Sequence, residues 1–105
     1  MIKEYHDAIR SAPGDSKYYY MKAKALMQVQ DWHNALLCLN DALQLSPNKA
    51  RYYLGRAYVY ACQGKHVLAE KDLAQACFFN PKFKNVKLPD REKGIGIANK
   101  SRISN

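Results

Sequence analysis

The residues of this sequence that most readily bind metals or act as nucleophiles are three histidines and three cysteines. They are scattered along the chain, at His6, His33, His66, Cys38, Cys62 and Cys77. Only Cys62 and His66 have the four-residue spacing of ligands on one helical face, and Gly64 interrupts the helical pattern between them. Because a bound metal needs three or four converging ligands, we expect no metal site.

The segment at residues 94–101 (GIGIANKS) has the glycines and the lysine of a phosphate-binding loop. Asn99, however, stands where the Walker A pattern requires glycine, and neither an apolar strand before it nor a helix after it is indicated. A flexible basic segment is the better interpretation. The sequence suggests no catalytic Ser-His-Asp or Cys-His arrangement and isolates no carboxylate pair on an apolar face, so we expect no catalytic residue, no cofactor and no enzymatic activity.

Hydropathy and cysteine content favour a soluble cytoplasmic protein. The chain has no run of about 18 apolar residues, the length that a membrane span requires. Its first residues, MIKEYHDAIR, carry charges where a signal peptide is apolar. The cysteines are odd in number and form no Cys-x-x-Cys pair, which is typical of reduced thiols in the cytosol.

The elements that would position any functional residue follow a repeat. Three of the four prolines, Pro13, Pro47 and Pro81, lie 34 residues apart. A period of about 20–50 residues is typical of stacked repeat proteins. The same shift superposes Tyr18 on Tyr52, Tyr19 on Tyr53, Ala23 on Ala57, Ala35 on Ala69, Leu39 on Leu73 and Ala42 on Ala76.

Apolar residues within these segments recur at steps of three and four, which is the spacing of one helix face. We therefore predict an all-α fold, and Asp15 or Ser16 is expected to cap the second helix. The predicted helices cover residues 2–11, 16–29, 32–45, 50–63 and 66–79. Small residues should let helices approach closely, with tyrosine and tryptophan filling the remaining space. These positions are Ala23, Ala35, Ala57 and Ala69, and Tyr19, Trp32, Tyr53 and Tyr60.

The pattern resembles the tetratricopeptide repeat (TPR), a helix-turn-helix unit of 34 residues that ends in proline. The resemblance lies in Tyr-x-x-[Lys/Arg]-Ala-x-x-[Leu/Tyr], then Ala after a turn, then Leu, Ala and Pro. It implies a right-handed superhelix of stacked antiparallel hairpins. Gln30 stands where the turn glycine is usual, which we expect to loosen the first turn. The predicted divisions are residues 1–15 (second helix of an incomplete leading repeat), 16–49 and 50–83 (TPR units), and 84–105 (basic tail).

In such repeats the first helices line a concave groove that binds other proteins. If Tyr19, Ala23 and Leu26 pack inward, nine residues of the first helices are expected in the groove. They are Lys17, Tyr20, Met21, Lys24, Gln28, Arg51, Leu54, Tyr58 and Cys62. The resemblance implies a protein-protein interaction module, an adaptor or scaffold similar to co-chaperones.

The groove residues indicate the chemistry of the partner. Tyr20, Met21, Leu54 and Tyr58 are large and apolar at positions that the core is not expected to need, so they are predicted anchors. The basic residues among the nine favour an acidic segment. Many TPR adaptors hold an acidic chaperone tail through a clamp of Lys, Asn and Arg. Here Tyr20, Leu54 and Gly55 occupy clamp positions, so that clamp is not reproduced.

The basic tail provides an alternative function. Residues 82–105 hold seven of the seventeen Lys and Arg but only two of the nine Asp and Glu. Such segments bind phosphates, although Phe83 is the only aromatic residue there, so base stacking is lacking. A nucleic-acid-associated or self-assembling structural protein is therefore the alternative, and strong salt dependence of binding would distinguish it.

About three repeats are normally needed to bury a continuous core, and this chain has two and a half. We expect its apolar end faces to be covered. The tail folding back, self-association or further parts of a longer protein could each provide that cover.

Overall fold

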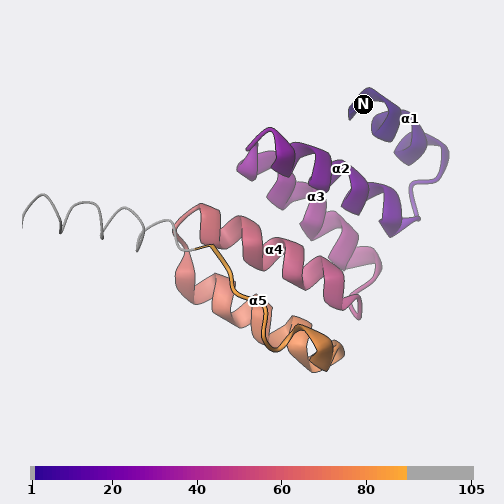
Figure 1. The fold of residues 1–105 in the computed structure, drawn as a ribbon. Coiled ribbons are helices and arrows are strands. Elements are labelled where there is room, and N and C mark those ends of the chain that lie inside the picture. Colours follow the sequence, from indigo (N-terminus) through magenta and orange to yellow (C-terminus); the bar gives the residue numbers. More distant parts are fainter. Residues whose placement is uncertain (1, 90–105) are drawn as a thin grey trace, which may run out of the picture.

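The computed structural model describes residues 2–89 of the chain (Figure 1). Within this range the fold is all-α, as predicted, and contains no strand. Each α-helix begins at the predicted residue and ends within one residue of the predicted end. The elements are α1 (Ile2–Ser11), α2 (Ser16–Gln28), α3 (Trp32–Leu45), α4 (Ala50–Cys62) and α5 (His66–Phe79), followed by the short 3-10 helix η1 (Pro81–Phe83).

Side-chain caps start the two helices of the first unit. Asp15 precedes α2 and accepts a hydrogen bond from the Lys17 N–H at 3.0 Å. Asp31 precedes α3 and accepts from both the backbone and the side chain of Asn34, at 3.4 and 2.8 Å. The helices of the second unit follow lysines, which offer no acceptor, so packing must fix where α4 and α5 begin.

The two turns inside the repeat units share one backbone geometry. Gln30 after α2 and Gly64 after α4 both have positive φ, at 61° and 78°. In each turn a following N–H donates to a carbonyl five residues earlier, which satisfies the end of the helix. The bonds are Asp31 N to Leu26 O at 2.9 Å and Lys65 N to Tyr60 O at 2.8 Å. Gln30 thus adopts the conformation of the usual turn glycine, and the first turn has the same hydrogen-bonded geometry as the second.

Each helix packs mainly against the next one along the chain, so the hairpins lie side by side (Figure 1). Small residues are buried at these contacts, as predicted. Gly55 shows how close the approach is, since an added Cβ would lie 3.3 Å from Leu39 Cδ2. Leu39 and Val59 are the largest fully buried side chains. The buried small residues include Ala23, Ala35, Ala42, Ala57, Ala69 and Ala76.

The most buried tyrosine is Tyr52, which was not among the predicted space-filling residues. Tyr52 is 6% exposed, and its hydroxyl lies 3.0 Å from Ser16 Oγ, which in turn lies 2.8 Å from Ser46 Oγ. Tyr53 is only half-buried, and its hydroxyl donates to the carbonyl of Pro47 at 2.8 Å. A polar chain of three hydroxyls thus joins the start of α2 to the junction of α3 and α4.

The chain turns back after α5. Residues 84–89 run back across the α4–α5 hairpin (Figure 1), and Val86, Leu88 and Pro89 are half-buried. The beginning of the predicted basic tail thus lies against the last hairpin. The rest of the predicted basic tail, residues 90–105, lies outside the described residues, and so does the segment at residues 94–101.

Candidate peptide-binding surface

The nine predicted groove residues come from α2 and α4 and differ in exposure. Three are half-buried: Tyr20, Leu54 and Cys62. Six are exposed: Lys17, Met21, Lys24, Gln28, Arg51 and Tyr58.

A hollow of about 180 Å³ lies between α1 and α2. Its lining combines apolar side chains with one ammonium group and one amide. Met21, which is 37% exposed, forms part of the apolar wall. The lining residues are Tyr5, Met21, Lys24, Ala25 and Gln28.

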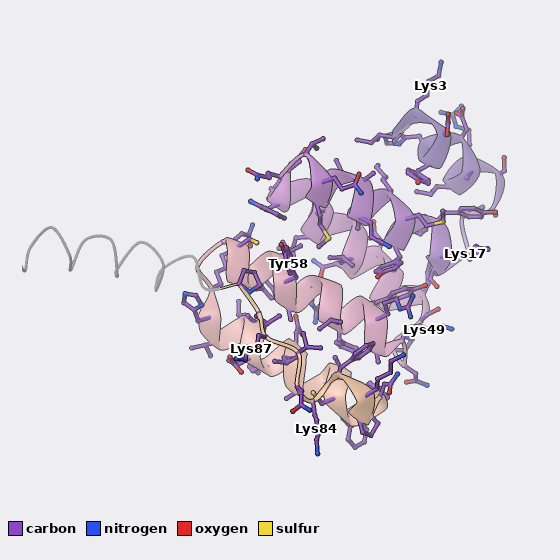
Figure 2. The ribbon with its side chains drawn as sticks, in the orientation of Figure 1. Lys3, Lys17, Lys49, Tyr58, Lys84 and Lys87 are labelled. Atoms are coloured by element: carbon purple, nitrogen blue, oxygen red, sulfur yellow. The ribbon has the colours of Figure 1, made fainter. Side chains whose placement is uncertain are left out.

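A second hollow, of about 280 Å³, lies between α2 and α4. It is lined by Lys24, Met27, Gln28 and Tyr58. Figure 2 shows Tyr58 on the side of α4 that faces α2 and α3, and the side chain is 42% exposed. The Tyr58 ring lies 6.2 Å from the ring of Trp32, centroid to centroid, which supports its position.

Lys24 and Gln28 line both hollows, so the hollows adjoin. The structure thereby brings together four of the nine predicted residues, all from the C-terminal halves of α2 and α4 or close to them. We call this site the Lys24 surface, and it consists of Tyr5, Met21, Lys24, Met27, Gln28 and Tyr58.

Lys17 and Arg51 lie apart from the Lys24 surface, near the N-terminal ends of their helices. Figure 2 shows Lys17 at the opposite end of α2 from Tyr58. The ammonium of Lys17 lies 5.5 Å from the ring of its neighbour Tyr18. The predicted set of three basic residues is therefore divided, and within residues 2–89 Lys24 is the one charged residue that lines the two hollows.

Tyr20 packs in the core, contrary to the expectation that the core does not need it. Its ring centroid lies 4.8 Å from that of Tyr52, and its Cε1 would lie 3.6 Å from a Cβ at Gly55. Burial raises the pKa of the Tyr20 phenol, an effect that the nearby charge of Arg51 partly opposes. Tyr20 still reaches the site indirectly, because the Lys24 ammonium lies 5.6 Å from its ring centroid.

Leu54 and Cys62 line neither of these two hollows, while Tyr5 and Met27 line them without having been predicted. Tyr5 falls on the repeat frame at the position of buried Leu39, so its type and spacing indicated a core residue. It is instead half-buried because α1 is the outermost helix and nothing described packs over it. The sequence feature that could have identified Tyr5 as a surface residue is its place in the incomplete leading repeat.

Among residues 2–89, no three side chains of His, Cys, Asp or Glu are grouped so that they could hold a metal ion. In the same part of the chain, none of the helices combines the length and apolar character needed to cross a membrane.

No protein-family model matches this chain, and no curated protein matches it in sequence. The TPR assignment therefore depends on the 34-residue pattern together with the helical hairpins, and it stays a prediction.

Proposed function

We propose that this chain is a protein-binding module of the TPR type, an adaptor or scaffold that binds an extended segment of another protein at the Lys24 surface. The proposal includes a right-handed superhelix in which α2 and α4 line the concave side. One observation carries it: four residues selected as groove residues from the sequence pattern and its resemblance to TPR units line two adjoining hollows. They are Met21, Lys24, Gln28 and Tyr58.

The chemistry of the surface specifies the segment. Lys24 lies between two apolar walls, one formed by Met21 and one by Met27 with Tyr58. An acidic side chain placed at Lys24, with bulky apolar side chains before and after it, would satisfy all three features. Methionine adapts its shape to different apolar groups, so we expect tolerance at the apolar positions and a stricter requirement for the acidic one.

The test is a titration of the protein with a library of short acidic peptides that carry one or two bulky apolar residues. Tyr58→Ala should weaken binding by about 1–2 kcal/mol, because partly exposed aromatic anchors carry much of the energy of such interfaces. Phe78→Ala is the matched control, since Phe78 is a 77% exposed aromatic residue on α5. This control should bind the selected peptides as the wild type does.

Charge is tested separately. Lys24→Gln should lower the association rate and remove the preference for acidic peptides, whereas Lys71→Gln, an exposed lysine on α5, should do neither. Equal binding by the wild type and Tyr58→Ala would contradict the proposal. Binding that is lost only on deletion of residues 90–105, and that falls by orders of magnitude with added salt, would move the function to the basic tail.

A further inference from the structure

Arg56 joins α4 and α5 of the second repeat unit through a partly buried ion pair, and joins both to α3 of the preceding unit through a further hydrogen bond. Arg56 of α4 donates two hydrogen bonds to the carboxylate of Asp72 on α5, from Nε at 2.7 Å and from Nη2 at 2.9 Å. Its Nη1 donates to Asn40 Oδ1 of α3 at 2.9 Å. Arg56 thus binds one acceptor from its own unit and one from the unit before.

The 34-residue shift places Lys22 at the position of Arg56, His6 at that of Asn40 and Cys38 at that of Asp72. The contact equivalent to that of Arg56 with Asn40 is preserved, since Lys22 Nζ lies 3.3 Å from Nδ1 of His6. The contact equivalent to that of Arg56 with Asp72 is missing, because the thiol of Cys38 replaces the carboxylate. The ion pair of Arg56 with Asp72 is the one ion pair within residues 2–89. No described carboxylate oxygen therefore lies within 4.0 Å of the Lys22 ammonium.

Cys38 does not supply the missing negative charge. It is buried, and this burial raises the pKa of its thiol, which the charge of Lys22 only partly opposes. The thiol is therefore neutral near pH 7. Lys22 faces a neutral group at the position where Arg56 faces an anion.

A hollow of about 430 Å³ opens beside Lys22. Its lining includes the polar residues His6, Asn34, Cys38 and Asp41 and the apolar residue Leu37. Lys22 is two residues from Lys24, about 200° around the helix, so this hollow opens on the other side of α2 from the Lys24 surface. It is larger than either hollow of that surface.

We propose that this hollow binds a carboxylate group, which occupies in the first repeat unit the place that Asp72 fills in the second. The carboxylate accepts hydrogen bonds from the Lys22 ammonium, and its carbon chain lies along Leu37. The ligand is either an acidic side chain of a protein or a small free carboxylate. The site is independent of the peptide-binding function proposed for the Lys24 surface.

The carboxylate of Asp41 limits the affinity expected for the carboxylate ligand. Its carboxylate lines the same hollow and has the charge of the ligand, so the binding should be weak and should improve when that charge is removed. A site for a cation would behave in the opposite way, since a cation would need Asp41.

The experiment is an amide-detected NMR titration of the whole chain at constant ionic strength. The probes are acetyl-glutamate-amide, its neutral analogue acetyl-glutamine-amide, and propionate. The glutamate probe should shift the amides around Lys22 and Cys38, and the glutamine analogue should not. Tighter binding of the glutamate probe than of propionate identifies an acidic side chain as the ligand, and the reverse order identifies a small free carboxylate.

Variants locate the site. Lys22→Met should lower the affinity for the glutamate probe by about tenfold or more, because a charged hydrogen bond is lost. Lys71→Met on α5 should leave this affinity unchanged. Cys38→Asp should also prevent binding, since the new carboxylate fills the site from within, whereas Cys38→Ser should retain it. Asp41→Asn should strengthen binding several-fold.

Three results would overturn the proposal. They are equal affinity of the wild type and a folded Lys22→Met variant, equal affinity for the glutamate and glutamine probes, and weaker binding by Asp41→Asn. Circular dichroism confirms folding of each variant. If Cys38→Asp does not fold, the comparison of Lys22→Met with Lys71→Met still decides. Failure here leaves the peptide titrations with Tyr58→Ala unaffected, so the two proposals fail separately.

Discussion

Gln30 occupies a backbone conformation that costs energy for any residue with a Cβ. Its φ of 61° is close to the 78° of Gly64, its equivalent in the second unit. In this region a side chain clashes with the backbone, while glycine adopts it freely. We predict that Gln30→Gly stabilises the protein by about 0.5–1 kcal/mol, the strain relieved being partly offset by the greater freedom of glycine in the unfolded chain.

Urea denaturation measures this effect. The reciprocal change, Gly64→Ala, is the matched control and should destabilise the protein by about 1 kcal/mol, since open space surrounds Gly64 and only the backbone opposes a side chain. A loss of stability in Gln30→Gly would show that the side chain of Gln30 contributes more than its backbone costs.

The burial of individual side chains was the property that the sequence predicted least well. The repeat frame treats Tyr18 and Tyr52 as equivalent, yet Tyr52 is buried and Tyr18 is only half-buried. Burial of Tyr52 depends on Ser16 and Tyr20 of the preceding unit, and the leading half unit offers Tyr18 no such neighbours. The 34-residue period identifies equivalent positions, but it does not indicate which of them is covered by residues of a preceding unit.

The contact of Arg56 with Asp72 fixes α5 against α4. The side chains are 23% and 8% exposed, so removal of one partner leaves a largely buried charge or donor group unmatched. We predict that Asp72→Ala lowers the free energy of unfolding by about 2–4 kcal/mol. Asp41→Ala is the exposed control on α3 and should change it by less than about 0.5 kcal/mol.

The pH dependence of this contact has a definite sign. The hydrogen bond to Asp72 raises the pKa of Arg56 above its already high ordinary value, with burial opposing the shift. A raised pKa in the folded state stabilises fully below the ordinary value and is lost only as pH rises through the folded one. The titration of Arg56 therefore adds no pH dependence to the free energy of unfolding near neutrality.

Urea denaturation measures the effect of Asp72→Ala and of its control Asp41→Ala. A similar loss of unfolding free energy in both variants would contradict the role assigned to the ion pair.

Element boundaries were predicted well because proline, the turn residues and apolar spacing mark them locally. Pro47 and Pro81 follow the ends of α3 and α5, and Asp15 and Asp31 cap α2 and α3. The ion pair was not predicted, because Arg56 and Asp72 are separated by a turn and their meeting depends on how α4 and α5 pack. The two hollows were predicted only in part for the same reason, since Tyr5 reaches the first through the packing of α1 on α2 and Met27 lines the second through the packing of α2 beside α4.

In the whole described molecule, the segment after α5 packs on the last hairpin. Residues 84–89 lie across the α4–α5 hairpin (Figure 1), with Val86 and Leu88 half-buried. Burying an aliphatic side chain completely contributes about 1.5–3 kcal/mol, so two half-buried ones contribute less than two full side chains would. This short segment is thus expected to stabilise the last hairpin without forming a third unit.

We predict that the double variant Val86→Ser, Leu88→Ser, made in the full chain, lowers the free energy of unfolding by about 1–2 kcal/mol. Lys84→Ser, Lys87→Ser is the matched control, because both lysines are exposed in the same segment (Figure 2), and it should change stability by less than about 0.5 kcal/mol. Urea denaturation measures both, and sedimentation shows whether the uncovered hairpin associates with a second copy. Unchanged stability with a monomeric double variant would mean that the end face needs no cover, whereas new dimers would show that a second copy can replace residues 84–89.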